Sequence, residues 1–371
     1  MAIWKIDELG EFVTLKRGYD LPQQKRKNGE IPIFSSSGVT GTHNEAMVEA
    51  PGVITGRYGT IGEVFFAETS FWPLNTTLYV ENFHENDEKF VYYFLKTLEW
   101  KKFASASAVP GINRNTVHKE IVRFPDFETQ QKIASVLSTI DKKIAVNKAI
   151  NDNLEQQAVT YFQELYINNA NPMWQIGTIS DLGTVVGGST PSKTKPEYYT
   201  NNGIAWITPK DLSINKSKFI SHGENDITEL GLKNSSATVM PKGTVLFSSR
   251  APIGYIAIAS NEVTTNQGFK SVVPYLEIGT AFVYFFLKHS LPVIESAASG
   301  STFKEISGSA MKNIPAIIPD RSTLDQFNSF CAPIFAQQKI LEDQNYSLAM
   351  LRDSLLPKLM SGAIDIASIQ L

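Results

Sequence analysis

The sequence predicts an α+β protein made of two similar, β-rich modules, each followed by a long helix. The first observation behind this prediction is an internal repeat: the stretch that begins at Trp4 is similar to the stretch that begins at Trp174. Further marks recur in the same order: Arg57 with Arg250, Asn75 with Asn266, Val91–Lys96 with Val283–Lys288, and Pro125-Asp126 with Pro319-Asp320. The second observation is that the sequence pattern changes at each Pro-Asp pair. The third is a coiled-coil pattern after each pair.

These marks set the expected boundaries. We predict a first module at 1–125, a first long helix at 126–168, a linker at 169–173, a second module at 174–319, a second long helix at 320–361 and a tail at 362–371. A chain of 371 residues has room for two or three domains of ordinary size.

Both modules contain short β-type runs broken by Gly, Asn and Pro, of which Gly52–Phe66 and Gly243–Ile258 are the clearest. Arg57 and Arg250 each fall in a turn between two such runs. The short polar segment before Trp174 is rich in turn-forming residues, which is typical of a linker.

The stretches after the Pro-Asp pairs contain no glycine, and Asp126 and Asp320 are well placed as helix N-caps. Apolar residues recur there at heptad-like spacing, which predicts a coiled-coil seam. The predicted seam residues are Ile133, Leu137, Ile140, Ile144 and Leu154 in the first helix, and Phe327, Ile334, Leu341, Leu348 and Leu355 in the second. The alternative is two amphipathic helices that each cover their own module.

Polar residues interrupt both seams. Asn147 and Asn151 interrupt the first, and Gln338 and Asn345 lie on the companion line of the second. A polar residue in a seam weakens pairing but specifies its register. Pro357 is expected to bend or end the second helix near its last turn.

The bulk composition excludes several classes of protein. Apolar residues make up 42% of the chain, but the longest apolar runs are too short to cross a bilayer and no leader is visible, so we expect a cytoplasmic protein without membrane contact. Cys331 is the only cysteine, which excludes an internal disulfide; we expect it to be a buried thiol. The net charge of −3 argues against a generic nucleic-acid binder, so DNA contact requires local patches or a partner's charge.

No catalytic or metal site is predicted. The chain has no Asn-Pro-Pro-aromatic run, no glycine-rich loop suited to S-adenosylmethionine, no nuclease carboxylate pattern and no metal-ligand spacing among its five histidines. Gly187–Thr194 resembles a phosphate loop only superficially, since a proline interrupts it and no glycine precedes its lysine. The sequence indicates a binding protein.

Two sets of polar residues are candidates for DNA contact. Arginine and amide side chains read base edges, and the base-reading candidates are Arg57, Tyr58, Asn75, Thr76, Ser248, Ser249, Arg250, Asn266 and Gln267. Cations neutralise phosphates, and the phosphate candidates are Lys16, Arg17, Lys25, Arg26, Lys27, Lys193, Lys195 and Lys210. The alternatives are that the arginines and amides brace loops and that the lysines are merely solvated.

Several stretches together resemble one known family. They are Phe127–Asp141, Leu182–Ser192, Ala205–Leu212, Met240–Gly254 and Leu355–Gly362. With the duplication, they make the chain similar to the specificity subunit, HsdS, of type I restriction–modification enzymes over essentially its whole length. The first repeat departs from the family pattern, because Lys16–Asp20 stands where the second repeat has Gly-Gly-Ser-Thr-Pro-Ser.

The resemblance implies two target recognition domains that read the halves of a split double-stranded DNA target, with different sequences read by each. It implies that the two helices pack as an antiparallel coiled coil with pseudo-two-fold symmetry, whose length sets the gap between half-sites. It further implies a non-catalytic subunit that binds no cofactor itself. Two methylation (M) subunits would bring S-adenosylmethionine, and restriction (R) subunits would bring ATP and Mg²⁺. The rival reading is a stand-alone sequence-specific DNA-binding regulator without enzyme partners.

Overall fold

The computed structural model describes residues 3–105, 110–250, 252–300 and 304–366. It contains two compact units. Unit 1 comprises residues 1–145 and 346–371, and unit 2 comprises residues 146–345. Of the predicted tail at 362–371, residues 367–371 lie outside the described part of the chain.

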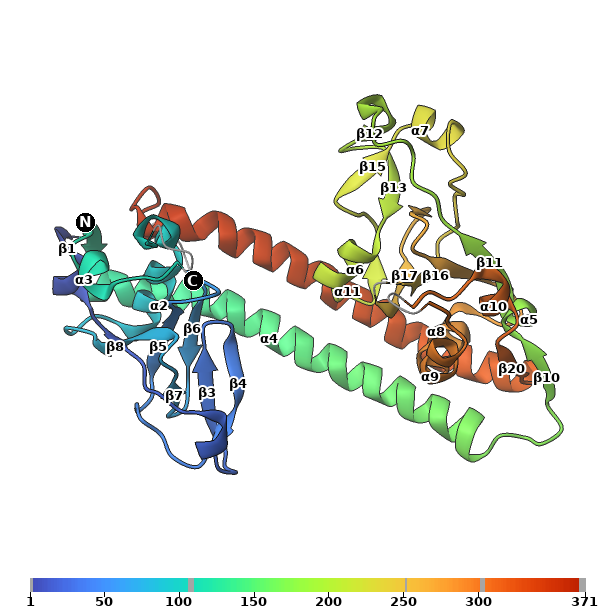
Figure 1. Cartoon of the computed structure of the whole chain (residues 1–371), viewed down its shortest axis with the longest axis horizontal. Coiled ribbons are helices and arrows are strands. Elements are labelled where there is room, and N and C mark those ends of the chain that lie inside the picture. The colour runs from blue at the N-terminus through green and yellow to red at the C-terminus, as the bar shows by residue number, and fades with distance from the viewer. Residues whose placement is uncertain (1–2, 106–109, 251, 301–303, 367–371) are drawn as a thin grey trace. The chain divides into compact units, whose positions relative to one another are not determined.

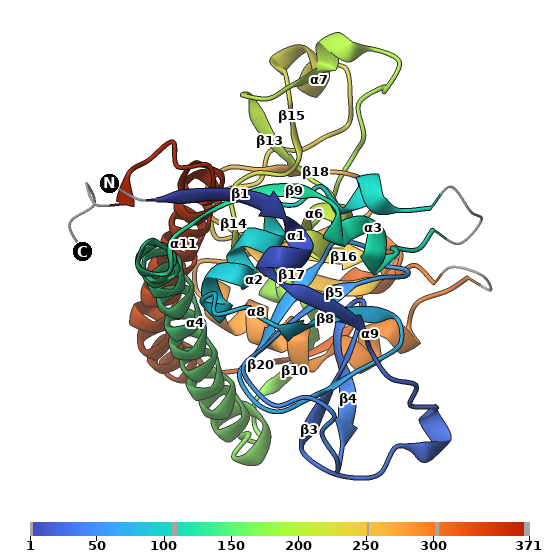
Figure 2. The same ribbon diagram turned by 90° about the vertical axis from the view of Figure 1, so that its left-hand side faces the viewer.

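The described strands of unit 1 form three small sheets (Figure 2). The main one has the strand order β2-β8-β5-β6, with all neighbours antiparallel. The second has the order β4-β3-β7, and the third pairs β1 with β9. The strands are β1 (Trp4–Glu8), β2 (Thr14–Arg17), β3 (Ile31–Ser35), β4 (Gly38–His43), β5 (Gly52–Gly56), β6 (Val64–Ala67), β7 (Trp72–Pro73), β8 (Thr77–Asn82) and β9 (Ile121–Pro125).

Helix α2 forms the centre of the unit 1 core. The other short helices of this unit are α1 (Leu9–Phe12), η1 (Gln23–Lys25), η2 (Trp100–Phe103) and α3 (Arg114–His118), and α2 spans Glu88–Lys96. Phe90, Val91 and Leu95 of α2 are fully buried, because α2 packs between the main sheet and the first long helix. This is the Val-Tyr-Tyr-Phe-Leu-Lys stretch that the repeat singled out.

Unit 2 repeats this plan with additions. Its main sheet has the order β11-β19-β16-β17-β14, a second sheet has the order β12-β15-β13-β18, and β10 pairs with β20. The strands are β10 (Gln175–Thr178), β11 (Gly183–Gly187), β12 (Tyr199–Thr200), β13 (Ile204–Ile207), β14 (Phe219–Ile220), β15 (Asn225–Ile227), β16 (Val245–Ser249), β17 (Ile253–Ala259), β18 (Thr264–Thr265), β19 (Lys270–Pro274) and β20 (Pro315–Ile318). The second sheet stands out from the rest of unit 2 (Figure 1).

Helix α8 (Thr280–His289) plays the part in unit 2 that α2 plays in unit 1. Its side chains from Ala281 to Leu287 are all buried, and it packs against β16, β17 and β19. The remaining helices of the unit are η4 (Pro196–Tyr198), α5 (Ile179–Leu182), α6 (Pro209–Ile214), α7 (Glu229–Lys233), α9 (Leu291–Ser296) and α10 (Gly308–Lys312).

The two long helices are α4 (Phe127–Gln163), followed by the π-helical turn η3 (Glu164–Asn168), and α11 (Arg321–Met360). Both N-cap predictions are confirmed. Asp126 accepts from the backbone N–H of Thr129, and Asp320 accepts from that of Thr323, each at 3.0 Å. Helix α11 ends one turn after Pro357, as expected, but it also runs through Pro333.

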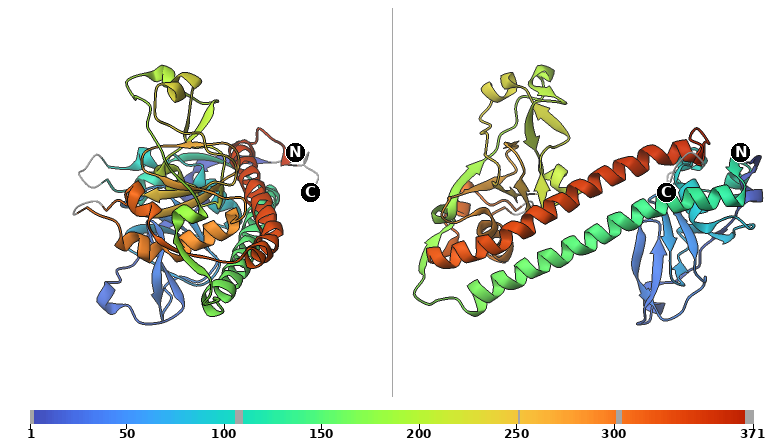
Figure 3. Two further views of the ribbon diagram at one scale, coloured as in Figure 1. Left: turned by 90° about the vertical axis from the view of Figure 1, so that its right-hand side faces the viewer. Right: turned by 180° about the vertical axis from the view of Figure 1, so that it is seen from behind.

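In each unit α4 and α11 lie side by side (Figures 1 and 3). In unit 2, Asn147 contacts Asn345, whereas Tyr161, further along α4, contacts Phe330, which comes earlier in α11. The helices therefore pack antiparallel there. In unit 1, Asp141 and Arg352 form an ion pair at 2.8 Å.

All ten predicted seam residues are at least half-buried. Ile133, Leu137, Ile140, Phe327, Ile334 and Leu341 are buried, while Ile144, Leu154, Leu348 and Leu355 are half-buried. Asn147 is fully buried and donates to the side-chain oxygens of Gln344, at 3.2 Å, and Asn345, at 3.0 Å. The polar residues thus pair with one another in the middle of α4 and α11.

The predicted fold class is confirmed: the chain is α+β, with two repeated β-rich domains and a long helix in each half. Cys331 is fully buried on α11, and burial raises the pKa of its thiol to about 12. Among the described residues, every helix is too short or too polar to span a lipid bilayer.

Candidate nucleic-acid interface

The same three segments meet at one end of the main sheet in both units. They are the end of β2 or β11, the end of β5 or β16, and the turn that precedes β8 or β19. In unit 1 the backbone N–H groups of Arg57 and Tyr58 both donate to the carbonyl oxygen of Thr76, at 2.8 and 3.2 Å. In unit 2 the N–H of Ser249 donates to the carbonyl oxygen of Gly268 at 2.8 Å. We call these two places the unit 1 edge and the unit 2 edge.

A glycine lets the backbone segments approach closely at each edge. A Cβ atom at Gly18 would lie 2.2 Å from the carbonyl oxygen of Leu74, and one at Gly188 would lie 2.1 Å from that of Asn266. Real side chains do not tolerate such contacts, so these positions require glycine. Gly18 directly follows β2 and Gly188 directly follows β11, so each begins the segment that joins the edge.

The base-reading candidates with amide side chains lie in the resulting turns, where hydrogen bonds hold them. The side-chain amide of Asn75 donates to Asp20, and the hydroxyl of Thr190 donates to the amide oxygen of Gln267. Asn266 accepts from the backbone N–H of Gly268 at 2.9 Å. These amides therefore shape the turns, and each keeps further donor or acceptor atoms for a ligand.

At the unit 1 edge, the Arg57 side chain supports a loop with only part of its hydrogen-bonding capacity. Its Nε donates to the carbonyl oxygen of Ile112 at 3.0 Å, and its guanidinium lies 4.6 Å from the centre of the Tyr58 ring. A guanidinium has five N–H donors, so most remain available. Within the described part of the chain, no carboxylate forms an ion pair with Arg57.

The unit 1 edge encloses a hollow of about 560 Å³ whose lining includes four cationic side chains and one ring: Lys16, Arg17, Arg57, Arg114 and Tyr58. Lys16 is paired with Glu81, a hydrogen bond that raises the pKa of Lys16 above its ordinary value. Arg17 lies 3.5 Å from Asp20, and Arg114 is exposed. The hollow therefore holds more positive than negative side chains, which suits a phosphate or a guanine edge.

The unit 2 edge is charge-compensated. Arg250 lies 3.2 Å from Glu305, and Lys270 lies 3.9 Å from the other oxygen of the same carboxylate. Burial lowers the pKa of Lys270, although Glu305 opposes this. Residues Arg250 and Glu305 also pair through their backbones. Glu305 thus faces both cations of this edge.

The structure corrects the base-reading assignment of Ser248 and Ser249. Both side chains are fully buried. The hydroxyl of Ser248 donates to the carbonyl oxygen of Pro252 at 2.8 Å and accepts from the N–H of Tyr255 at 2.7 Å. A buried, satisfied hydroxyl supports the turn that carries Arg250 and offers no surface to a ligand.

The other phosphate candidates lie in loops or on α6. Lys25 and Lys27 are exposed and Arg26 is half-buried, in the loop between β2 and β3, where the N–H of Lys27 donates to His43 at 3.0 Å. Lys193 and Lys195 are exposed between β11 and β12. Lys210 is exposed on α6 and pairs with Glu224 at 2.5 Å. These cations belong to the second sheet of each unit and its approach loops.

Two site residues escaped the sequence analysis. Arg114 belongs to the five-residue helix α3, which carries no periodic signal, and Glu305 lies in an irregular segment far from Arg250 in sequence. The described residues include no group of three or more His, Cys, Asp or Glu side chains that could hold a metal ion.

The sequence profile of the type I restriction modification DNA specificity domain matches residues 1–156 and 171–343. The chain belongs to this family. The profile matches twice, once over the first β-rich domain with most of α4 and once over the second β-rich domain with more than half of α11.

Specificity subunits are also its relatives among individual proteins. The type I restriction enzyme MjaIX specificity subunit of Methanocaldococcus jannaschii is 43% identical over 162 residues, which are 43% of this chain and 37% of that protein. The HindI specificity subunit of Haemophilus influenzae is 24% identical over 72% of this chain and 75% of its own length. The crystal structure of the type I restriction-modification system S subunit from M. genitalium shares the fold, with a TM-score of 0.65, 17% identity and 96% of both chains covered.

Proposed function

We propose that this specificity-family chain is the DNA-recognition subunit of a type I restriction–modification complex. In this proposal the unit 1 edge reads one half of a split double-stranded target and the unit 2 edge reads the other. The chain itself performs no chemistry. Adenine methylation is performed by two M subunits with S-adenosylmethionine, and cleavage by R subunits with ATP and Mg²⁺.

The observation that carries the proposal is the repeated edge. Both domains use a glycine-permitted close approach to bring an arginine turn beside an amide turn, so the same backbone arrangement occurs twice in one chain. The family match supports the DNA-recognition role. Two different edges on one chain are what a target with two unlike halves requires.

In the proposed mechanism, some side chains contact phosphates and others contact base edges. Phosphate contacts from cations such as Lys16, Arg17 and Arg114 fix the register of the unit 1 edge on the duplex without reading sequence. Arg57 and Arg250 then reach base edges in the major groove, where guanine offers two acceptors to one guanidinium. The paired helices α4 and α11 hold the two domains at a set gap along the DNA.

The charge distribution supports a need for partners. The chain carries a net charge of −3, and at the unit 2 edge Glu305 faces the arginine proposed to read DNA. DNA affinity depends strongly on the number of phosphates that cations neutralise. We therefore expect the isolated chain to bind DNA weakly and the complex with M subunits to bind it well.

The experiment is to co-express the chain with its M subunit in a host without DNA methylation and to map modified adenines across the genome. A single split motif with a fixed gap is the expected result. If the complex assembles with S-adenosylmethionine present and no motif is modified, the proposal fails and the stand-alone regulator takes its place.

A further inference from the structure

Among the residues that the structure describes, the main sheet of unit 2 has an edge strand that the main sheet of unit 1 lacks. β14 pairs parallel with β17, whereas the equivalent strand β6 ends the main sheet of unit 1. β14 is only two residues long, and on its own such a strand is marginal. Its position therefore depends on what holds it, and the residues that hold it lie on the long helices.

Glu342 on α11 holds the backbone of β14. Its two carboxylate oxygens accept from the consecutive N–H groups of Lys218, at 2.8 Å, and Phe219, at 3.0 Å. On the other side, the carbonyl oxygen of Lys218 accepts from Ile258 of β17 at 2.7 Å. This backbone segment is thus fixed to the sheet and to α11 at once.

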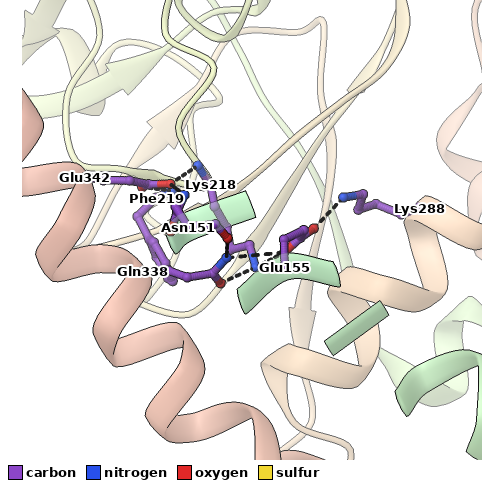
Figure 4. A network of polar contacts seen from close by, with 7 residues as sticks. All are labelled: Asn151, Glu155, Lys218, Phe219, Lys288, Gln338 and Glu342. Atoms are coloured by element: carbon purple, nitrogen blue, oxygen red, sulfur yellow. Dashed lines mark hydrogen bonds and ion pairs between the residues drawn. The ribbon is translucent and has the colours of Figure 1, made fainter. Parts of the chain in front are cut away.

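The side chain of Lys218 reaches further between the helices (Figure 4). Its ammonium pairs with Glu155 of α4 and donates to the side-chain oxygen of Gln338 of α11 at 2.5 Å. The Lys218 side chain is only 5% exposed, and its ammonium lies 4.2 Å from the centre of the Phe335 ring. One cation from the recognition domain therefore joins both long helices.

Two more residues complete this Lys218 network. Lys288 of α8 donates to the second oxygen of Glu155 at 2.6 Å. Gln338 donates to the backbone oxygen of Asn151 at 3.2 Å, and Asn151 donates to Glu342 at 3.4 Å. The network contains two cations and two carboxylates, so its charges balance.

Asn151 and Gln338 are the polar residues that interrupt the predicted seams. A buried polar group must be hydrogen-bonded, and a network of such groups accepts only one arrangement. Here the arrangement includes the recognition domain as well as the two helices. A shift of the domain by one helical turn would part the Lys218 ammonium from Glu155 and would take from Glu342 its two backbone donors, which costs far more than the shift of an apolar contact.

We infer that the Lys218 network sets the position of the second recognition domain on the helix pair, so that Lys218 and Glu342 are positioning residues for the gap between the two half-sites. The inference rests on the proposed function. Unit 1 uses a different device, in which the hydroxyl of Tyr93 on α2 donates to Asp141 at 2.6 Å and Asp141 pairs with Arg352. The second domain is thus held by contacts that the duplication did not copy.

The test uses the full chain assembled with its M subunit and compares the wild type with Lys218→Met and Glu342→Gln. Lys218→Met keeps the length of the side chain and removes its charge. Glu342→Gln is the milder change and keeps one accepting oxygen, so it serves if the first variant does not fold. Lys339→Met is the matched control, because Lys339 lies on the same helix and pairs with Asp343 at the surface.

Two readouts are needed. Amide hydrogen exchange at positions 218 and 219 is expected to rise by about tenfold or more in Glu342→Gln, since this variant removes the charged acceptor of both N–H groups and a hydrogen bond to a charged group is worth at least that factor. In Lys218→Met exchange at the same positions is expected to rise as well, because the side chain no longer anchors this segment to Glu155 and Gln338. Genome-wide mapping of modified adenines is expected to find both half-sites unchanged and sites with a gap one base pair longer or shorter now modified as well. The Lys339→Met control should match the wild type in both.

A variant that exchanges faster but keeps the single wild-type gap overturns the inference, and so does a variant unchanged in both readouts. A wild-type complex that modifies no split motif is a separate result. It defeats the proposed function, and the positioning role falls with it, whatever the exchange rates show.

Discussion

Arg57 and Arg250 hold equivalent places but have different neighbours. Arg57 contacts a carbonyl oxygen and a ring, while Arg250 faces Glu305. Sequence reasoning placed both arginines in turns between strands, which the structure shows. It could not find their partners, because Ile112 and Glu305 come from loops more than 50 residues away in the chain.

Arg57→Ala is expected to relax recognition at one half-site only, and Arg250→Ala at the other. Each bidentate contact to a base is worth about 1–3 kcal/mol of discrimination, so modification of wrong bases at that position should rise by about tenfold or more. Mapping of modified adenines measures this. Arg17→Ala is the control, expected to weaken binding at all sequences alike; equal loss at every sequence in all three variants would remove the base-reading role.

Glu305→Gln is expected to strengthen DNA binding that does not depend on sequence. The change removes the carboxylate shared by Arg250 and Lys270 and keeps the shape of the side chain. Affinity for a random duplex should rise, and the rise should shrink as salt is added, because phosphate contacts release counterions. Titration of the assembled complex at low and high salt checks this, and an affinity gain that salt does not reduce would contradict it.

Asp126, the N-cap residue of α4, is expected to make the free energy of unfolding depend on pH. Hydrogen bonds from the N–H groups of Ile3 and Thr129 lower the pKa of Asp126 below its ordinary value of 3.8. A carboxyl whose folded pKa is lowered stabilises the fold above the unfolded pKa and loses this effect as the pH falls through the folded pKa.

Asp126→Ala should therefore lower the free energy of unfolding by about 1 kcal/mol at pH 7, and the difference from the wild type should shrink below pH 3.8. Denaturant titrations at several pH values measure it. Glu128→Ala, an exposed change in the same first turn, is the control. A difference that stays constant down to pH 2 would show that the charge of Asp126 plays no part.

Among the elements, the long helices were the most predictable and the added strand the least. Heptad spacing, a glycine-free sequence and Asp N-caps are local features of the sequence, so they predict α4 and α11. β14 has two residues and no pattern, and it exists because Glu342 and β17 hold it. Lys218 could not be predicted as a network residue, since nothing near it in sequence reveals that it is buried.

Pro333 shows how packing overrides a local signal. A proline within a helix removes one hydrogen bond and crowds the carbonyl group of the residue four positions earlier, here Ser329. Helix α11 nevertheless continues through it, because Cys331 and Ile334 on either side are buried in the unit 2 core.

Pro333→Ala is expected to raise the free energy of unfolding by about 1–3 kcal/mol, because Pro333 is exposed and the change restores the helix at no loss of packing. Pro357→Ala is the control and should gain less, since Pro357 lies in the last turn. Thermal or denaturant unfolding measures both. A loss of stability in Pro333→Ala would mean that the helix needs the local distortion.

For the whole molecule, the gap between half-sites should follow the length of the helix pair. Insertion of one heptad after Ala145 in α4 and one after Asn345 in α11 keeps the seam in phase and adds about 10 Å to each helix. The modified motif should then keep both half-sites and gain about three base pairs in its gap. Genomic mapping measures the gap, and an unchanged gap would exclude the helices as the spacer.

Gly18 and Gly188 give the two domains a common evolutionary constraint. A mutation to any larger residue at either position collides with main-chain atoms, so these positions have one tolerated amino acid. Exposed cations beside these glycines, such as Arg17 and Arg114, project from a backbone that the close main-chain contact fixes. Under the proposed function, a new DNA specificity then requires the substitution of a few surface side chains and leaves the fold of the domain unchanged.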